Sequence, residues 1–113
     1  MTLKRVTPET AVLRACMLAA TAAGARVWRN NTGVLLDANK RPVRFGLCRG
    51  SSDLIGITRA GRFLAVECKR GRGGVVTPEQ TQFLDTIRAM GGVAILARSG
   101  EDVTKALTEE TLT

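Results

Sequence analysis

The order of the predicted elements indicates an α/β fold in which helices flank a central mixed sheet. Two stretches, residues 7–23 and 77–90, carry apolar side chains at helical spacing and a proline in the first turn. Between them, the apolar runs at residues 53–58 and 62–69 are separated by a short turn, which predicts an antiparallel hairpin. Another apolar run, residues 93–97, follows the second helix, and such a crossover returns the chain parallel to a core strand.

Residues 7–23 have the start and stop signals of a helix. Thr7 is suited to cap the N-terminus, Pro8 fits the first turn, and Gly24 ends the helix. Its apolar stripe consists of Val12, Leu13, Cys16, Met17, Ala19 and Ala20. Glu9 falls at the second helical position. Its negative charge complements the helix dipole there, which by itself explains the residue.

Residues 26–31 are predicted to form the first strand. Alternation along the strand places Arg29 and Asn31 on one face, where they either contact substrate phosphate near the site or lie in solvent. Trp28 falls on the opposite face. We expect it in the core, and a role as a base-stacking platform is the less favoured alternative.

Residues 33–36 are predicted to continue this first strand beyond a turn near Thr32 and Gly33. The polar residues 37–42, which end in Arg-Pro, mark a loop or hairpin tip. Residues 43–47 then form a short strand that returns toward Asp53.

Three charged side chains gather at the open end of the hairpin predicted from residues 53–58 and 62–69. If residues 60–61 form its tip, Asp53 lies beside Glu67 and Lys69. The latter two share one face about 7 Å apart, and Cys68 points to the other. Two carboxylates suit a hard cation such as Mg²⁺ or Mn²⁺, and a lysine suits an anionic substrate. An ordinary ion pair at a sheet edge is the alternative interpretation.

Residues 70–74 follow Lys69 as a basic, glycine-rich loop. Glycine lets the backbone approach a phosphate closely, and Arg70 and Arg72 can make bidentate contacts to an anion. A plain linker is the alternative, but the position next to Glu67 favours a loop that contacts a phosphate group of the substrate.

The second helix begins with a capping box, in which Thr77 caps the helix, Pro78 follows, and Gln80 lies three residues after the cap. This capping role is enough to explain the presence of Gln80, even if the residue takes no part in catalysis. The apolar face of this helix comprises Phe83, Leu84, Ile87 and Met90, and Gly91 and Gly92 stop it. A last helix is predicted from residue 99 or 100, with inward-facing Val103, Ala106 and Leu107.

Length and composition indicate one globular domain over residues 1–113, with 44% hydrophobic and 24% charged residues. The net charge of +7 and the pI near 10.4 favour a nucleic acid as partner. Histidine and tyrosine are absent, which excludes histidine-based triads and enzymes that form a phosphotyrosyl intermediate. Cleavage of a phosphodiester would therefore depend on carboxylates, lysine and metal.

Cysteines 16, 48 and 68 form no C-x-x-C pair and are expected to be reduced, mostly buried thiols of an intracellular protein. The longest uncharged run, residues 15–25, is too short and too rich in alanine for a membrane span. Residues 1–5 precede polar residues and a proline, so we predict no signal peptide there.

An aspartate followed by Glu-x-Lys resembles the core of the PD-(D/E)xK nucleases, and the wider set of motifs resembles the VRR-NUC family in its stand-alone, phage-encoded type. The matching segments are Glu9 and residues 29–33, 50–54, 66–69, 77–82 and 90–97. One departure is Ser52, which stands where the family has proline and which shapes the turn without carrying chemistry.

The resemblance implies a restriction-endonuclease-like core and metal-dependent hydrolysis of DNA. Asp53 and Glu67 would hold Mg²⁺ or Mn²⁺, assisted by the main-chain carbonyl of Cys68 and, through water, by Glu9. Lys69 would orient the attacking water or stabilise the pentavalent phosphate.

The resemblance also implies that Gln80 aligns this water. Nucleic-acid contacts are expected from Arg29, Asn31, Arg70 and Arg72. Stand-alone relatives act as homodimers on branched DNA such as four-way junctions, so we expect a homodimer in the cytoplasm of a bacterial host if the chain is phage-encoded.

Three alternatives to a nuclease remain open at the level of sequence. The first is a non-catalytic basic DNA-binding module that keeps the nuclease fold. The others are a basic subunit that binds another protein, and a metal-dependent phosphoesterase acting on nucleotides.

Overall fold

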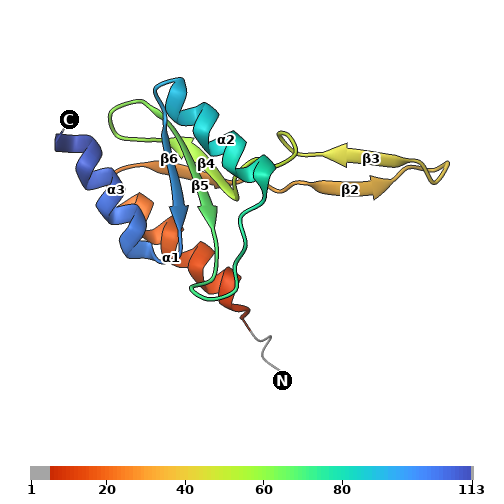
Figure 1. Cartoon of the computed structure of the whole chain (residues 1–113), viewed down its shortest axis with the longest axis horizontal. Helices are drawn as coiled ribbons and strands as arrows, with labels where there is room; N and C mark the ends of the chain where they lie inside the picture. Colours follow the sequence, from red (N-terminus) through yellow and green to blue (C-terminus); the bar gives the residue numbers. More distant parts are fainter. Residues whose placement is uncertain (1–5, 113) are drawn as a thin grey trace.

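The structure, a computed structural model, describes residues 6–112, so the signal-peptide prediction for residues 1–5 lies outside it. Nine elements follow one another along the described residues (Figure 1). In order they are α1 (Pro8–Ala22), β1 (Arg26–Arg29), β2 (Gly33–Leu36), β3 (Pro42–Phe45), β4 (Leu54–Ile57), β5 (Phe63–Cys68), α2 (Pro78–Ala89), β6 (Val93–Ala97) and α3 (Gly100–Leu112).

Four strands form the main sheet in the order β1-β4-β5-β6. β4 is antiparallel to both β1 and β5, whereas β6 is parallel to β5 because α2 carries the chain back across the sheet. The predicted α/β fold with a central mixed sheet is therefore confirmed. β5 lies inside the sheet with a strand on each side, so its polar residues do not belong to a sheet edge.

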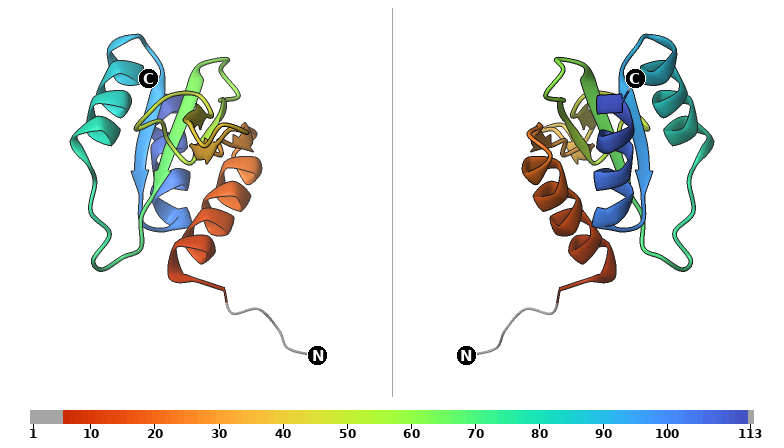
Figure 2. Two further views of the ribbon diagram at one scale, coloured as in Figure 1. Left: turned by 90° about the vertical axis from the view of Figure 1, so that its right-hand side faces the viewer. Right: turned by 90° about the vertical axis from the view of Figure 1, so that its left-hand side faces the viewer.

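The helices cover the two faces of the main sheet unequally. α1 and α3 pack together on one face, and α2 lies on the other against β5 and β6 (Figure 2). Alternate residues of β5, namely Leu64, Val66 and Cys68, join side chains of α1 and α3 in the hydrophobic core. The remaining residues of β5, which include Glu67, face the layer of α2.

The predicted helix starts are confirmed. The Thr7 hydroxyl accepts a hydrogen bond from the Thr10 N–H at 3.1 Å, and Pro8 opens α1. Thr77 and Gln80 form the reciprocal capping box at the start of α2. α1 ends before Gly24, whose φ of +85° suits glycine and turns the chain into β1.

β2 and β3 do not belong to the main sheet. They pair only with each other, and Figure 1 shows this hairpin projecting from the body of the molecule. The prediction that residues 33–36 continue the first strand is therefore wrong, because the chain leaves the main sheet after Arg29. The predicted tip at residues 37–42 is confirmed, and there Asp37 accepts hydrogen bonds from the N–H groups of Asn39 and Arg41.

Two apolar side chains that were predicted to be buried are exposed. Trp28 is 56% exposed because it faces the part of the sheet that α2 leaves open. Met90 is 83% exposed because it follows the last turn of α2 and extends beyond the sheet that the helix covers.

Cys16 and Cys68 are buried and Cys48 is exposed, and all three thiols are free. The part of the chain that the structure describes contains no helix long and apolar enough to cross a bilayer.

Candidate active site

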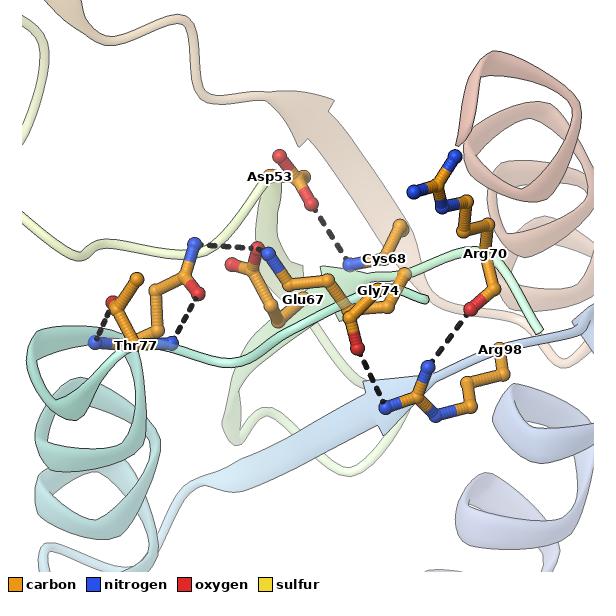
Figure 3. A network of polar contacts seen from close by, with 9 residues as sticks. Asp53, Glu67, Cys68, Arg70, Gly74, Thr77 and Arg98 are labelled. Atoms are coloured by element: carbon orange, nitrogen blue, oxygen red, sulfur yellow. Dashed lines mark hydrogen bonds and ion pairs between the residues drawn. The ribbon is translucent and has the colours of Figure 1, made fainter. Parts of the chain in front are cut away.

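Asp53 and Glu67 lie opposite each other at the open end of the β4–β5 hairpin. The register pairs Leu54 with Val66, so the residue before Leu54 faces the residue after Val66. Asp53 Oδ2 accepts a hydrogen bond of 2.8 Å from the Cys68 N–H (Figure 3). This main-chain bond fixes one oxygen of the Asp53 carboxylate and turns the group toward the end of β5.

The Glu67 carboxylate is buried, with only 3% of its surface exposed. Its Oε1 accepts a hydrogen bond from Gln80 Nε2 at 3.0 Å and lies 3.4 Å from Lys69 Nζ. Its Oε2 is buried and has no hydrogen-bond partner in the described part of the chain. Burial and then the charge of Asp53 raise the pKa of Glu67 to about 7, although Lys69 acts in the opposite direction.

This pair of carboxylates offers the oxygen ligands that divalent cations such as Mg²⁺ prefer. A bound cation would give the unpartnered oxygen of Glu67 a partner and would offset the repulsion between Glu67 and Asp53. Within residues 6–112, however, no three side chains of histidine, cysteine, aspartate or glutamate are grouped closely enough to hold a metal. The protein side chains therefore offer two ligands, and any other ligands must be main-chain oxygen or water.

Gln80 links the start of α2 to the carboxylates. Its Oε1 accepts the Thr77 N–H at 3.0 Å while its Nε2 donates to Glu67. The same side chain therefore closes the capping box and orients Glu67 (Figure 3). The structural role and the proposed site role do not compete, because they use the two ends of one amide.

The turn before Asp53 is held from two sides. Gly50 has a φ of +80°, and a Cβ there would meet the main chain of Glu79 at 2.6 Å. Only glycine therefore lets this turn lie against the first turn of α2. On the other side, the Asn30 amide donates to Ser51 Oγ at 2.7 Å and to the Ser52 carbonyl at 2.9 Å.

Asn30 was missed by the sequence interpretation, which selected Asn31 instead. The Asn30 N–H also donates to the Asp53 carbonyl at 2.8 Å, so this residue joins the end of β1 to the aspartate turn. Asn31 is exposed in the connection to β2. The sequence signal for this contact was the pair of adjacent asparagines. Strand alternation from Arg29 led to the choice of Asn31, whereas Asn30 is the residue that reaches the aspartate turn.

Glu9 and Arg29 meet Asp53 from the other side of the sheet end. A pocket of about 150 Å³ is lined by Glu9, Thr10, Leu13, Arg29, Asp53 and Cys68. α1 and β1 thus bring both predicted residues to Asp53, but Glu67 does not line this pocket. A larger open hollow on the outer side of α2 contains none of the predicted site residues.

Cys68 contributes its main chain at the site, while its thiol faces the core beside Cys16. The hydrogen bond with Cys16, together with burial, raises the pKa of the Cys68 thiol, and the same bond lowers that of Cys16. The thiol of Cys68 is therefore kept in its neutral form, away from the carboxylates.

The loop at residues 70–74 is fastened by a residue that the sequence did not reveal. Arg98 donates to the Arg70 carbonyl at 2.8 Å and to the Gly74 carbonyl at 3.1 Å (Figure 3). These partners are main-chain atoms, so no sequence motif marks the contact. The side chains of Arg70 and Arg72 are exposed on the loop that Arg98 closes.

At the level of sequence, no family model and no curated protein matches this chain. A solved structure described as "VRR_NUC domain" is similar, with a TM-score of 0.61 and 22% sequence identity. The similarity covers 90% of this chain and 96% of the other. The chain has the fold of a VRR-NUC domain.

Proposed function

We propose that the chain is a metal-dependent endonuclease that hydrolyses DNA phosphodiesters. The observation that carries this proposal is the buried Glu67 carboxylate, which has an unpartnered oxygen and lies beside Asp53 in a VRR-NUC fold. A purely structural ion pair does not explain it, because Lys69 contacts only the other oxygen of Glu67. Holding the negative charge of Asp53 next to the buried Glu67 carboxylate costs free energy, and a bound cation would offset this cost.

Asp53 and Glu67 would hold Mg²⁺ or Mn²⁺, with the Cys68 carbonyl as a third ligand and Glu9 acting through water. When bound, such a cation lowers the pKa of a coordinated water and neutralises charge that develops on the phosphate. Glu9 is suited to this indirect role because it lines a pocket with Asp53 that Glu67 does not share.

Lys69 and Gln80 would act on the reacting groups next to these carboxylates. The side chain of Lys69 is 12% exposed, so it is largely buried but still open to the site, where its ammonium can donate to a phosphate oxygen or orient the attacking water. Gln80 holds Glu67 with one amide hydrogen, and the second hydrogen is left to align that water.

DNA is the proposed substrate because the chain is strongly basic and its cations surround the site. Arg29 lines the pocket beside Asp53, and Arg70 and Arg72 are exposed on the loop at residues 70–74 that Arg98 holds in place. Asn31 is exposed just after β1 and is retained as a contact. Phosphate contacts of this kind supply affinity for any DNA sequence, so branch geometry is the feature that we expect to select the substrate.

We further propose that the chain acts as a homodimer through the β2–β3 hairpin. Its exposed large apolar side chains are Val34, Leu35, Leu36, Val43 and Phe45, with Leu47 just beyond β3. Together they expose roughly 600 Å², compared with about 800 Å² per partner in a typical stable interface. A two-stranded hairpin is marginally stable by itself in water, so a second copy of the same hairpin would stabilise both.

Two sites related by a two-fold axis would suit paired cuts in a four-way junction. In this proposal residues 1–113 form one nuclease domain of the stand-alone, phage-encoded type, which works inside the bacterial host cell.

The test is cleavage of an end-labelled four-way junction and of a linear duplex with the same sequence, each with Mg²⁺, with Mn²⁺ and with chelator. We expect paired cuts in the junction that require metal. Binding without cuts in either metal would overturn the nuclease proposal and leave a non-catalytic DNA-binding module with this fold.

A further inference from the structure

The sheet face that carries Glu67 is only half covered. α2 packs over β5 and β6, whereas the part formed by β1 and β4 is open. On this face Trp28 of β1, Ile57 of β4 and Phe63 at the start of β5 are 56%, 50% and 42% exposed. A group of large apolar side chains that is open to solvent beside a candidate site indicates a binding surface.

The strand register places Trp28 near the two carboxylates. Trp28 pairs with Ile55, and Ile55 pairs with Ala65, so these three side chains point to the same side. Glu67 lies two residues after Ala65 and shares that side. Asp53 lies just before β4, at the end of the sheet, where it also lines the pocket on the α1 side. From strand spacing and rise, the Cα atoms of Trp28 and Asp53 are about 8 Å apart.

Arg26 adds a cation beside the indole ring. It lies two residues before Trp28 on β1, pairs with Ile57, and therefore shares the open face. Arg26 is exposed and takes part in no ion pair with the side chains that the structure describes. A single-stranded nucleic acid is bound by this combination, in which aromatic rings stack on bases and cations contact the backbone.

We propose that Trp28 is a stacking platform for an unpaired base next to the phosphate that is cleaved. This inference rests on the proposed nuclease function, and it explains how the nuclease would select branched DNA. In a continuous duplex both faces of every base are already stacked on neighbouring bases, so none is free for Trp28. A junction, fork or gap presents a base that can turn onto the indole ring.

The charge of this face favours a nucleic acid over a second copy of the chain. Two copies placed face to face would bring their Arg26 guanidinium groups near each other on a protein that already carries a net charge of +7. Phosphate groups complement the same charge. Self-association has a separate and more apolar surface in the β2–β3 hairpin.

Trp28 can be observed directly because it is the only tryptophan in a chain that has no tyrosine. The experiment titrates the full chain, in chelator, with a single-stranded oligonucleotide, a forked duplex and a fully paired blunt duplex. Intrinsic fluorescence reports on the indole ring, and anisotropy of labelled DNA reports on binding. We expect saturable quenching with the first two substrates and little quenching with the blunt duplex at equal occupancy.

Substitution separates stacking from general binding. Trp28→Ala is expected to weaken binding to the forked duplex about 10-fold while leaving the blunt duplex unchanged, and Trp28→Phe to retain most of the affinity. Met90→Ala, which removes an even more exposed apolar side chain just after the far end of α2, is the control and should change neither affinity. Thermal unfolding of each variant checks that the fold is retained.

Three outcomes would overturn the inference. The first is DNA binding, seen by anisotropy, without quenching of the tryptophan fluorescence. The second is an equal loss of affinity for the forked and the blunt duplex in Trp28→Ala. The third is tryptophan emission that changes with protein concentration and not with added DNA. Since every reading is taken in chelator, quenching by unpaired DNA in a protein that never cuts would leave the inference standing and remove only the proposed nuclease activity.

Discussion

The two β-hairpins of this molecule have opposite surroundings. The β4–β5 hairpin lies inside the main sheet and buries a carboxylate, whereas the β2–β3 hairpin projects into solvent and exposes its apolar side chains. In the sequence both are short apolar runs joined by a polar turn. The difference arises from their neighbours, and each hairpin departs from the usual rule of apolar inside and polar outside. Such departures reduce stability unless a ligand or partner offsets them, which is why the proposed cation and the proposed dimer contact are assigned to these two hairpins.

The largest effect is expected at the buried hairpin. Asp53→Ala removes a proposed cation ligand, so cleavage should fall by at least about 1000-fold. DNA binding should remain or become tighter, because a negative charge is lost. Junction cleavage and anisotropy measured on the same preparations would check both halves of this prediction. Asp85→Asn, which changes an exposed carboxylate on α2, is the control, and equal activity of Asp53→Ala and wild type would refute the site.

The energetic cost of the buried polar group can be measured without any substrate. The Glu67 pKa of about 7 lies above the ordinary value of 4.5, so the folded state binds this proton more tightly than the unfolded state does. Stability should therefore fall as the pH rises from 4.5 to 7 and stay level above pH 7. In chelator, urea unfolding at about pH 5 and about pH 8 should show a decrease that Glu67→Gln reduces by up to about 3 kcal/mol. An unchanged decrease in the variant would show that Glu67 is not the buried acid.

The projecting hairpin can be tested in the opposite way, by adding a charge. Leu35 is 67% exposed, so Leu35→Asp should leave the monomer folded but weaken self-association about 30-fold, because a carboxylate would be buried between two copies. Sedimentation over a range of concentrations measures this change. Leu18→Asp, at a 72% exposed position on α1, is the matched control. A wild-type chain that stays monomeric at high concentration would contradict the proposed dimer.

The smallest predicted effect concerns how the aspartate turn is held. Asn30→Ala loses two hydrogen bonds to Ser51 and Ser52 and leaves the Ser52 carbonyl unpaired, which should cost about 1–2 kcal/mol of stability. Since Asp53 is displaced and not removed, cleavage should fall mainly through kcat and far less than in Asp53→Ala. A variant with reduced stability but wild-type kcat would limit Asn30 to a purely structural role.

Local signals account for the parts of the fold that were predicted from sequence. The caps at Thr7 and Thr77 and the turn between β4 and β5 depend on residues only a few positions apart, and all three are confirmed. The meeting of Asp53 with Glu67 follows from that turn alone. These features could be predicted because the residues that determine them are close together in the chain.

Long-range packing explains the errors. Trp28 is exposed because α2 covers β5 and β6 and stops short of β1, which no residue near Trp28 determines. Residues 33–36 leave the main sheet because β4 pairs with β1 over only four residues. Arg98 acts on main-chain carbonyls of a distant segment, so its contact leaves no trace in the pattern of residue types. Asn30 could be suspected only from the adjacent pair of asparagines, which does not show which of the two reaches the Asp53 turn.

The contacts of Arg98 and Ala97 also set the order in which the site is completed during synthesis. Asp53, Glu67 and Lys69 emerge from the ribosome together, but the Lys69 N–H is held by the carbonyl of Ala97 and the adjoining loop by Arg98. Both partners belong to the last strand or lie just beyond it. A nascent chain therefore carries its carboxylates before it can position its lysine, and the proposed hydrolysis of DNA would begin only after most of the polypeptide has been made.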